Sequence, residues 1–336
     1  MEPILLIPIA ISFLTVILLL PSWIKKARRA GLLWRDMNKH KKSHVAGSGG
    51  IIVISGLIFG ILAYIAIHTF YFKGSGNAIE IFALTTSILI LAGIGLIDDL
   101  LGWIKGGLRR RLRMALCLFA AIPLIVINSG ISKITLPFLG AVDIGVLYII
   151  VAIPLGIVAT STTFNFLAGF NGLETGQGIM IFSALALVTY VTGNAWLSFI
   201  SLLVVISLLG FWFFNKYPAK VFPGDVMTYP IGGLIAIIAI LGNIEKIAII
   251  FFIPYILEVI LKVRGRLMMH SFGKPDKNNN LDMPYSKVYG LEHLAILILK
   301  KFRKKVTERG VVYVIHAFQL IFIIIGLLIM KNDFFM

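Results

Sequence analysis

Long apolar runs constrain this chain more than any other feature, because they recur at short intervals along nearly its whole length. A run of about 20 apolar residues spans the hydrocarbon core of a bilayer as an α-helix, in which the backbone polar groups are paired internally. The sequence therefore predicts an all-α, polytopic integral membrane protein with about ten transmembrane helices. The runs lie near residues 3–23, 49–70, 81–97, 112–128, 144–163, 178–192, 195–213, 228–242, 246–263 and 311–330.

Composition leaves no room for a separate soluble domain of ordinary size. Hydrophobic residues make up 59% of the chain, whereas a soluble domain is about 45–50% apolar. The longest polar stretch, 264–310, is short, so residues 1–336 are predicted to form a single membrane-embedded domain. The first run ends at Trp23 to Lys26 without a small-residue cleavage site, which favours a retained helix over a signal peptide. A single cysteine, Cys117, excludes a disulfide framework.

The net charge of +16 is distributed according to a membrane topology. With ten spans the loops alternate between the two sides of the membrane. The five odd-numbered loops, which follow the first, third, fifth, seventh and ninth spans, hold 27 of the 31 lysines and arginines. Cationic loops stay in the cytoplasm. These loops are therefore predicted to be cytoplasmic, and both termini are predicted to lie on the extracytoplasmic side of the cell membrane. Topology and attraction to anionic lipid headgroups account for the charge, and no nucleic-acid partner is expected.

Two adjacent carboxylates, Asp98 and Asp99, end an apolar run in "GLIDDLLG" on the predicted cytoplasmic side. Adjacent carboxylates repel each other, and a nearby cation or a raised pKa would relieve the repulsion. They are candidate catalytic residues. The alternative is that one of them caps the next helix. A basic run follows, with Arg109, Arg110 and Arg111 and then Arg113.

The stretch "FNFLAGFNGLETGQG", residues 164–178, interrupts two apolar runs with amides and four glycines. Asn165 and Asn171 offer amide oxygens to a hard cation or hydrogen bonds to a sugar or base. Glycines such as Gly169 let the backbone approach a ligand closely. The alternative is an ordinary turn between helices, because Asn and Gly both favour turns.

A third polar signal, Asp225 in "KVFPGDVMTYPIGG", lies where the next apolar run begins, and alone it could be a helix cap. Mg²⁺ binds one or two carboxylates and completes its coordination with waters and substrate phosphates. Asn165 and Asp225 would suit such an ion beside a diphosphate. An anionic substrate fits the basic surroundings, and the membrane position indicates a lipid reactant. The residues therefore indicate phosphoryl transfer at the cytoplasmic membrane surface.

Five motifs resemble, in order, those of the polyprenyl-phosphate N-acetylhexosamine-phosphate transferase family. The form "NGLE-x-GQ" favours its eukaryotic and archaeal branch, the UDP-N-acetylglucosamine–dolichyl-phosphate N-acetylglucosaminephosphotransferases, over the bacterial peptidoglycan translocase. The resemblance implies ten helices and a cytoplasmic active site. The motifs are "RDMNK", "GLIDDLLG", "NFLAGFNGLETGQ", "YPAKVFPGDVMTY" and "DMPYSK".

The resemblance also implies roles for single residues. Asn165 and Asp225 would hold magnesium, with manganese as an alternative, and Asp98 and Asp99 would lie near the reacting phosphates. Where the family carries an Arg- or His-rich donor-binding cluster, this chain has only His270 and Lys274. The substrate-binding candidates are Lys39 at the phosphate end, Asn171 near the nucleotide, Gly169, Glu174 as an orienting residue, Arg110, His270 and Lys274.

The implied reaction converts a UDP-N-acetylhexosamine and a polyprenyl (dolichyl-type) phosphate into a polyprenyl-diphosphate-linked sugar and UMP. Its place would be the first step of lipid-linked glycan assembly for protein N-glycosylation, and a homodimer is an accompanying expectation. Two mechanisms stay open: direct attack, with Asp98 taking a proton or orienting the lipid phosphate, and covalent catalysis by Asp99 or Asp225. A transporter or lipid flippase is the alternative class, because intramembrane carboxylates also mark transport paths.

Overall fold

The computed structural model describes residues 2–74, 76–127, 133–136 and 140–335. Within these residues, seven helices are long and apolar enough to cross a membrane, which shows a multi-pass helical membrane protein; the predicted number of ten is not confirmed. The long helices are α1 (Leu6–Ala30, after the 3-10 turn η1, Pro3–Leu5), α2 (Gly50–Phe70), α3 (Ala78–Lys105), α7 (Leu173–Val191), α8 (Ala195–Asn215), α9 (Asp225–Gly242) and α13 (Glu308–Phe335).

Two of the other apolar runs form interrupted helices, and the third forms one helix that begins with a π-helical turn. Each second segment has a proline in its first turn: Pro123, Pro154 or Pro254. Proline lacks an N–H and its ring clashes with the carbonyl four residues earlier, so a helix start suits it best, although Pro21 and Pro230 lie inside α1 and α9. The segments are α4 (Arg110–Phe119) with α5 (Ile122–Val126), the π-helical turn η2 (Tyr148–Ala152) with α6 (Ile153–Phe164), and α10 (Glu245–Phe251) with α11 (Ile253–Arg264).

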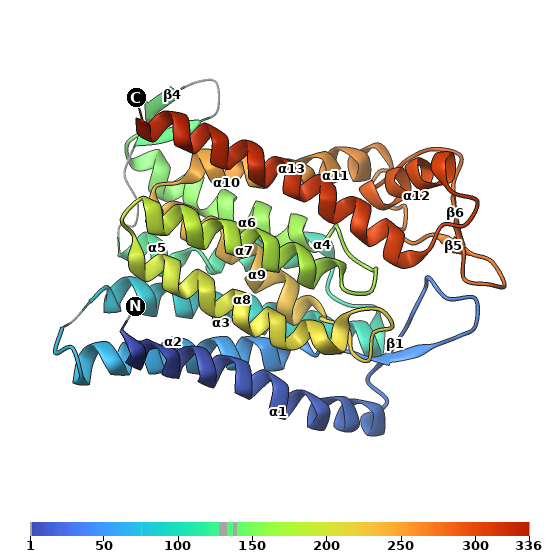
Figure 1. The fold of residues 1–336 in the computed structure, drawn as a ribbon, viewed down its shortest axis with the longest axis horizontal. Helices are drawn as coiled ribbons and strands as arrows, with labels where there is room; N and C mark the ends of the chain where they lie inside the picture. Colours follow the sequence, from blue (N-terminus) through green and yellow to red (C-terminus); the bar gives the residue numbers. More distant parts are fainter. Residues whose placement is uncertain (1, 75, 128–132, 137–139, 336) are drawn as a thin grey trace.

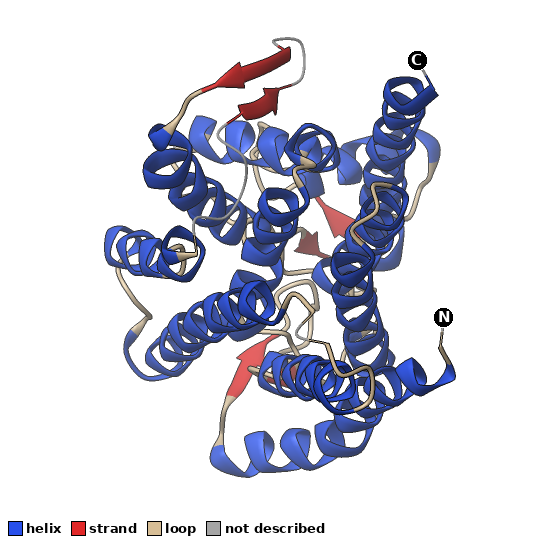
Figure 2. Cartoon of the chain, turned by 90° about the vertical axis from the view of Figure 1, so that its left-hand side faces the viewer, coloured by secondary structure: helices blue, strands red, loops and turns tan. Residues whose placement is uncertain are grey.

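One end of the bundle carries the connections that follow α1, α3, α6, α8 and α11 (Figure 1). We call it the basic end, since these connections together hold most of the lysines and arginines of the chain. α1 begins and α13 ends at the opposite end, which Figure 2 views nearly along the helices. The smaller elements are α12 (Leu291–Phe302) and three antiparallel hairpins, β1 (Leu33–Arg35) with β2 (His44–Ala46), β3 (Lys133–Leu136) with β4 (Gly140–Asp143), and β5 (Lys274–Pro275) with β6 (Leu281–Asp282).

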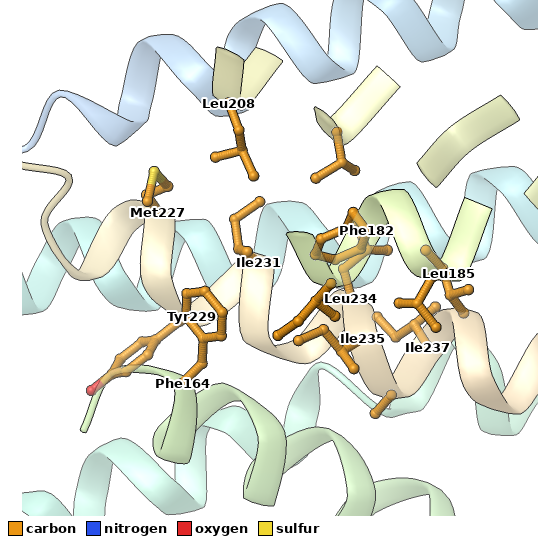
Figure 3. Packing of buried hydrophobic residues seen from close by; sticks show 14 of the residues in the cluster. Phe164, Phe182, Leu185, Leu208, Met227, Tyr229, Ile231, Leu234, Ile235 and Ile237 are labelled. Atoms are coloured by element: carbon orange, nitrogen blue, oxygen red, sulfur yellow. The ribbon is translucent and has the colours of Figure 1, made fainter. Parts of the chain in front are cut away.

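Helix α9 forms the centre of the bundle. Every residue from Val226 to Ile240 is buried, and α9 packs most extensively against α3 and α6. Figure 3 shows Tyr229, Ile231 and Ile235 of α9 among side chains of the surrounding helices, including Phe164 of α6 and Leu208 of α8. Helix α9 is therefore buried in protein along most of its length.

Glycines allow the backbones of α3 and α6 to touch α9. A Cβ atom on Gly95 of α3 would lie 2.2 Å from the carbonyl oxygen of Asp225. A Cβ atom on Gly232 of α9 would lie 2.5 Å from the carbonyl oxygen of Thr160 in α6. Small residues permit this approach in membranes, where helix association depends on close packing. The crossings bring the ends of α3 and α6 against the start of α9.

A pair of alanine substitutions in α3 tests this crossing. Gly95→Ala should lower the melting temperature of the purified protein in detergent, because overpacking costs about 1–3 kcal/mol. Gly93→Ala is the matched control, since a Cβ atom there meets nothing within 4 Å, and alanine favours the helix by up to ~1 kcal/mol. Equal melting temperatures for the two variants would contradict the packing described.

Candidate active site

A cavity of about 600 Å³ opens at the basic end, between the end of α3, the start of α4, the end of α6 and the start of α9. Its walls carry most of the polar residues singled out from the sequence. The titratable and amide side chains on it include Asp98, Asp99, Arg113, Asn165, Glu174, Asp225 and His270. Four separated stretches of the chain thus contribute to one site.

Asp98 is held in place by Arg113 and by the backbone. Its Oδ2 lies 2.5 Å from Nη1 of Arg113, and its Oδ1 accepts the N–H of Leu108 at 2.6 Å. The same arginine nitrogen lies 3.4 Å from Oδ2 of Asp225, and the guanidinium is 5.4 Å from the ring centre of Tyr229. Arg113 therefore contacts two carboxylates of the cavity wall, and its single positive charge balances only one of them.

Asp99 has a different partner, because consecutive residues of a helix point about 100° apart. Its carboxylate accepts the backbone N–H groups of Asp225 at 2.8 Å and of Val226 at 3.4 Å. The alternative that one of the two carboxylates caps the next helix is wrong, because α4 has no side-chain cap; Asp99 instead binds the first N–H groups of α9. Gly224 is required at this cap, since its φ is +73° and a Cβ atom would lie 2.2 Å from Oδ2 of Asp99.

Asn165 and Asp225 supply the oxygen atoms that remain available at the cavity. Asn165 ends α6, with Nδ2 3.5 Å from the Tyr229 hydroxyl, and among the described residues its Oδ1 accepts no hydrogen bond. Asp225 begins α9 without capping it, and its carboxylate lies between Arg113 and Asp98. It is only partly covered, with 22% of its side chain exposed.

The charge at this wall favours a divalent cation. Arg113 contacts the carboxylates of Asp98 and Asp225, and the third carboxylate, that of Asp99, is held by backbone N–H groups of α9. In the described part of the chain no three His, Cys, Asp or Glu side chains converge as a ready-made metal site. Mg²⁺ does not need such a set, because it takes one or two protein oxygens and completes its octahedron with water and phosphate. The residues present therefore fit that ion.

Glu174 and Gly169 form the turn that leads from α6 to α7. Gly169 has a φ of +100°, and its N–H donates to Oε1 of the buried Glu174 at 3.0 Å. Its carbonyl accepts a hydrogen bond from Nδ2 of Asn38 at 2.8 Å. Glu174 thus orients a backbone turn, in line with the orienting role expected for it. The turn presents Gly169 to the cavity against the ring of Phe272.

Asn171 and Lys39 lie behind this turn and do not line the cavity. Nδ2 of Asn171 donates to Oε1 of Glu308 at 2.5 Å and to Oδ2 of Asp36 at 3.0 Å, and its Oδ1 accepts the N–H of Ala219 at 3.1 Å. Lys39 forms an ion pair with the same Glu308. The structure therefore gives both residues structural partners, and their contact with substrate stays a prediction.

The basic candidates also divide into residues that line the cavity and residues that do not. His270 lines the cavity. Arg110 donates instead to the carbonyl of Leu267, and Lys274 is exposed on β5. Arg113 was noted only as part of a basic run, and sequence reasoning missed it as a site residue. The available signal was its position four residues before Cys117, which places it on the same helix face as that buried side chain.

A buried polar cluster supports the segment that carries His270. Lys262 of α11 pairs with Glu258 at 3.2 Å and donates a hydrogen bond to Ser271, the residue after His270. Nearby on α12, Nδ1 of the buried His293 accepts the N–H of Tyr289 at 3.2 Å. Burial, and then the charge of Lys262, lower the pKa of His293 to about 4.

The lowered pKa of His293 predicts an acid-sensitive fold. Its stabilising contribution is complete above the ordinary pKa of 6.5 and is lost as the pH falls toward about 4. When the pH is lowered from 7 to 4.5, the melting temperature of His293→Gln should fall by roughly 3–8 °C less than that of the wild type. Scanning calorimetry in detergent measures this. His44→Gln, exposed on β2, should follow the wild type, and parallel curves for His293→Gln would contradict the assignment.

These features define a class: a multi-pass helical membrane protein with a cavity at one end of the bundle that is lined by carboxylates, an arginine and an asparagine. Comparison with known proteins identifies the family. Residues 81–243, which include Asp98, Arg113, Asn165 and Asp225, match the profile of glycosyl transferase family 4.

The chain is similar to family members over much of its length. A Saccharolobus solfataricus protein with the provisional name UDP-N-acetylglucosamine–dolichyl-phosphate N-acetylglucosaminephosphotransferase is 36% identical over 96% of both chains. The Dictyostelium discoideum protein of that name is 30% identical over 73% of this chain and 68% of its own. A Streptococcus pneumoniae phospho-N-acetylmuramoyl-pentapeptide-transferase is 29% identical over 74% and 76%. The chain therefore belongs to glycosyl transferase family 4 and is a glycosyl-phosphate transferase.

Proposed function

We propose that the protein transfers N-acetylglucosamine 1-phosphate from UDP-N-acetylglucosamine to a polyprenyl phosphate of the dolichyl type. The products are polyprenyl-diphosphate-N-acetylglucosamine and UMP, at the first step of lipid-linked glycan assembly for protein N-glycosylation. The observation that carries the proposal is the convergence of Asp98, Arg113, Asn165 and Asp225 on one cavity. The names of the relatives supply the donor and the acceptor.

We place the basic end in the cytoplasm and both termini outside. The odd-numbered loops hold 27 of the 31 lysines and arginines, and such loops remain on the cytoplasmic side. The beginning of α1 and the end of α13 share the opposite end of the bundle (Figure 1), which agrees with an even number of crossings. The donor, a water-soluble nucleotide, would then reach the cavity from the cytoplasm.

The acceptor's lipid tail has a suitable path along α6 and α9. An apolar groove of about 160 Å³ lies between these helices and α10–α11, with Gly156, Ala236 and Ala239 among its walls. Gly156 precedes Asn165 by nine residues, which is about 14 Å along a helix. A prenyl chain in this groove would place its phosphate near Asn165 and Asp225, because the same two helices carry those residues.

The reaction forms a bond between an oxygen of the lipid phosphate and the phosphorus next to the sugar, and the bond from that phosphorus to UMP breaks. UMP leaves with the electron pair. Both reactants are anions, so their repulsion must be offset. Arg113 supplies fixed positive charge at the site. Mg²⁺ held by Asn165 and Asp225 would neutralise diphosphate charge.

The geometry favours direct attack over a covalent intermediate at Asp99. The lipid phosphate has a second pKa of about 6 and needs little help from a base. Asp98 is engaged by Arg113 and Leu108, so its role here is to orient the arginine. The carboxylate of Asp99 accepts two N–H groups of α9, and a nucleophile at this position would have to abandon that cap.

Asp225→Asn tests the metal assignment. It removes one negative charge from the proposed ion site, and we expect at least a 100-fold loss of transfer and a higher Mg²⁺ concentration for half-maximal rate. Initial rates across a Mg²⁺ series in detergent measure both. Glu80→Gln, on α3 at the opposite end of the bundle, is the control and should retain wild-type values. Wild-type transfer with an unchanged Mg²⁺ requirement in Asp225→Asn would refute the assignment.

A product assay tests the reaction itself. Purified protein incubated with labelled UDP-N-acetylglucosamine and dolichyl phosphate should release UMP and yield a lipid-linked sugar, detected by chromatography. UDP-N-acetylmuramoyl-pentapeptide should give no product, and transfer from it instead would assign the bacterial-type reaction. Failure with every UDP-sugar, in protein that still binds prenyl phosphate, would favour the transporter class.

A further inference from the structure

A second cavity, of about 480 Å³, opens at the basic end between α7, α8 and α13. The connection from α6 to α7 separates it from the candidate active site. Asn165 and Gly169 of this connection line the first cavity, whereas Asn171 and Gly172 line the second. The second cavity is therefore distinct from the proposed reaction site, although the two share a wall.

The rim of the second cavity is cationic. Lys216 and Arg309 are exposed there, and among the described residues that line the cavity none is acidic. Nη2 of Arg309 donates to the carbonyl of Tyr217 at 3.2 Å, and its guanidinium lies 4.8 Å from the Tyr217 ring centre. Nζ of Lys216 lies 4.8 Å from the Trp212 ring centre. Both charges are thus held over aromatic rings, and within the described part of the chain neither has a carboxylate partner.

The interior of the second cavity lies deeper along the helices and is mostly apolar, apart from His316 of α13. Its walls include Ile179 and Met180 of α7, Leu209 of α8 and Val312 of α13. Tyr313, 67% exposed, stands at the cavity. Helices α7, α8 and α13 begin or end at this level, where Trp and Tyr side chains gather at a membrane–water interface. The cavity thus has a positive rim and an apolar interior, in the order in which a lipid headgroup and chain are arranged.

We propose that this cavity binds an anionic membrane lipid with a phosphate headgroup. The phosphate lies between Lys216 and Arg309, and an acyl or isoprenoid chain packs against the apolar wall formed by Leu209 and Val312. Charge complementarity selects an anionic headgroup over a zwitterionic one. The bound lipid supports the wall formed by Asn171 and Gly172 and so stabilises the turn that carries Gly169 on its other side.

Titration of lipid into delipidated protein in neutral detergent tests the proposal. Phosphatidylglycerol should raise the melting temperature of the wild type by several degrees, and phosphatidylcholine should not. The double variant Lys216→Gln/Arg309→Gln should require at least fivefold more phosphatidylglycerol for the same shift. The matched control, Lys26→Gln/Arg29→Gln, removes two exposed cations from the basic end of α1 and should respond as the wild type does.

Further arms separate the alternatives. Lys216→Glu alone guards against misfolding, because Lys216 is exposed and its Nζ contacts only aromatic rings; this variant should also lose sensitivity to phosphatidylglycerol. The same stabilisation by inorganic phosphate at equal concentration would overturn the lipid assignment. An unchanged lipid response in the double variant would overturn the site. A dimer that dissociates only in the double variant would make this face an interface between protein copies instead.

Discussion

The architecture depends on the contact between the backbones of α3, α6 and α9. No hydrophobic driving force separates protein from lipid inside a bilayer, so helices must gain stability from close approach. Gly95 and Gly232 make that approach available, since side chains at these positions would overlap backbone atoms of the partner helix. Asp99 then caps the start of α9 from α3. The same contacts that hold the centre of the fold together also set the distance between Asp98, Asn165 and Asp225.

Much of the fold follows from hydropathy. The rest does not, because an apolar run does not reveal whether the helix within it is continuous. The apolar runs correctly predicted a polytopic helical protein, and the ends of α2, α8 and α9 lie close to the runs from which they were expected. The number of ten assumed that each run forms one uninterrupted helix. Pro123, Pro154 and Pro254 lie in the first turn of the second segment of three runs. Pro21 and Pro230, however, lie inside the continuous helices α1 and α9, so a proline in an apolar run does not by itself reveal where a helix ends.

The candidate site was predictable where residues lie at helix ends and less so where they lie in loops. Asn165 ends α6 and Asp225 begins α9, and both meet Asp98 in the last two turns of α3 at the same end of the bundle. Lys39 and Asn171 belong to longer connections, whose course depends on contacts with α13 through Glu308. That pairing spans well over a hundred residues, and no local pattern reveals it. Arg110 and Arg113 belong to the same basic stretch of sequence. Only their positions around helix α4 determine that Arg113 lines the cavity and Arg110 does not.

The interrupted helices have a consequence for how a long hydrocarbon chain reaches the protein. The apolar groove beside Gly156 is bordered by α6, which follows a π-helical turn, and by the junction of α10 and α11, and each of these points has a proline beside it. A continuous helix resists bending along its whole length, whereas helices kink at prolines and at π-helical turns. A groove that is bordered by such points can therefore open there. We therefore expect an isoprenoid to enter sideways from the bilayer and settle along the groove, without threading end-first through the protein. The acceptor's length would then matter little to catalysis, because the part beyond the groove stays among the lipids.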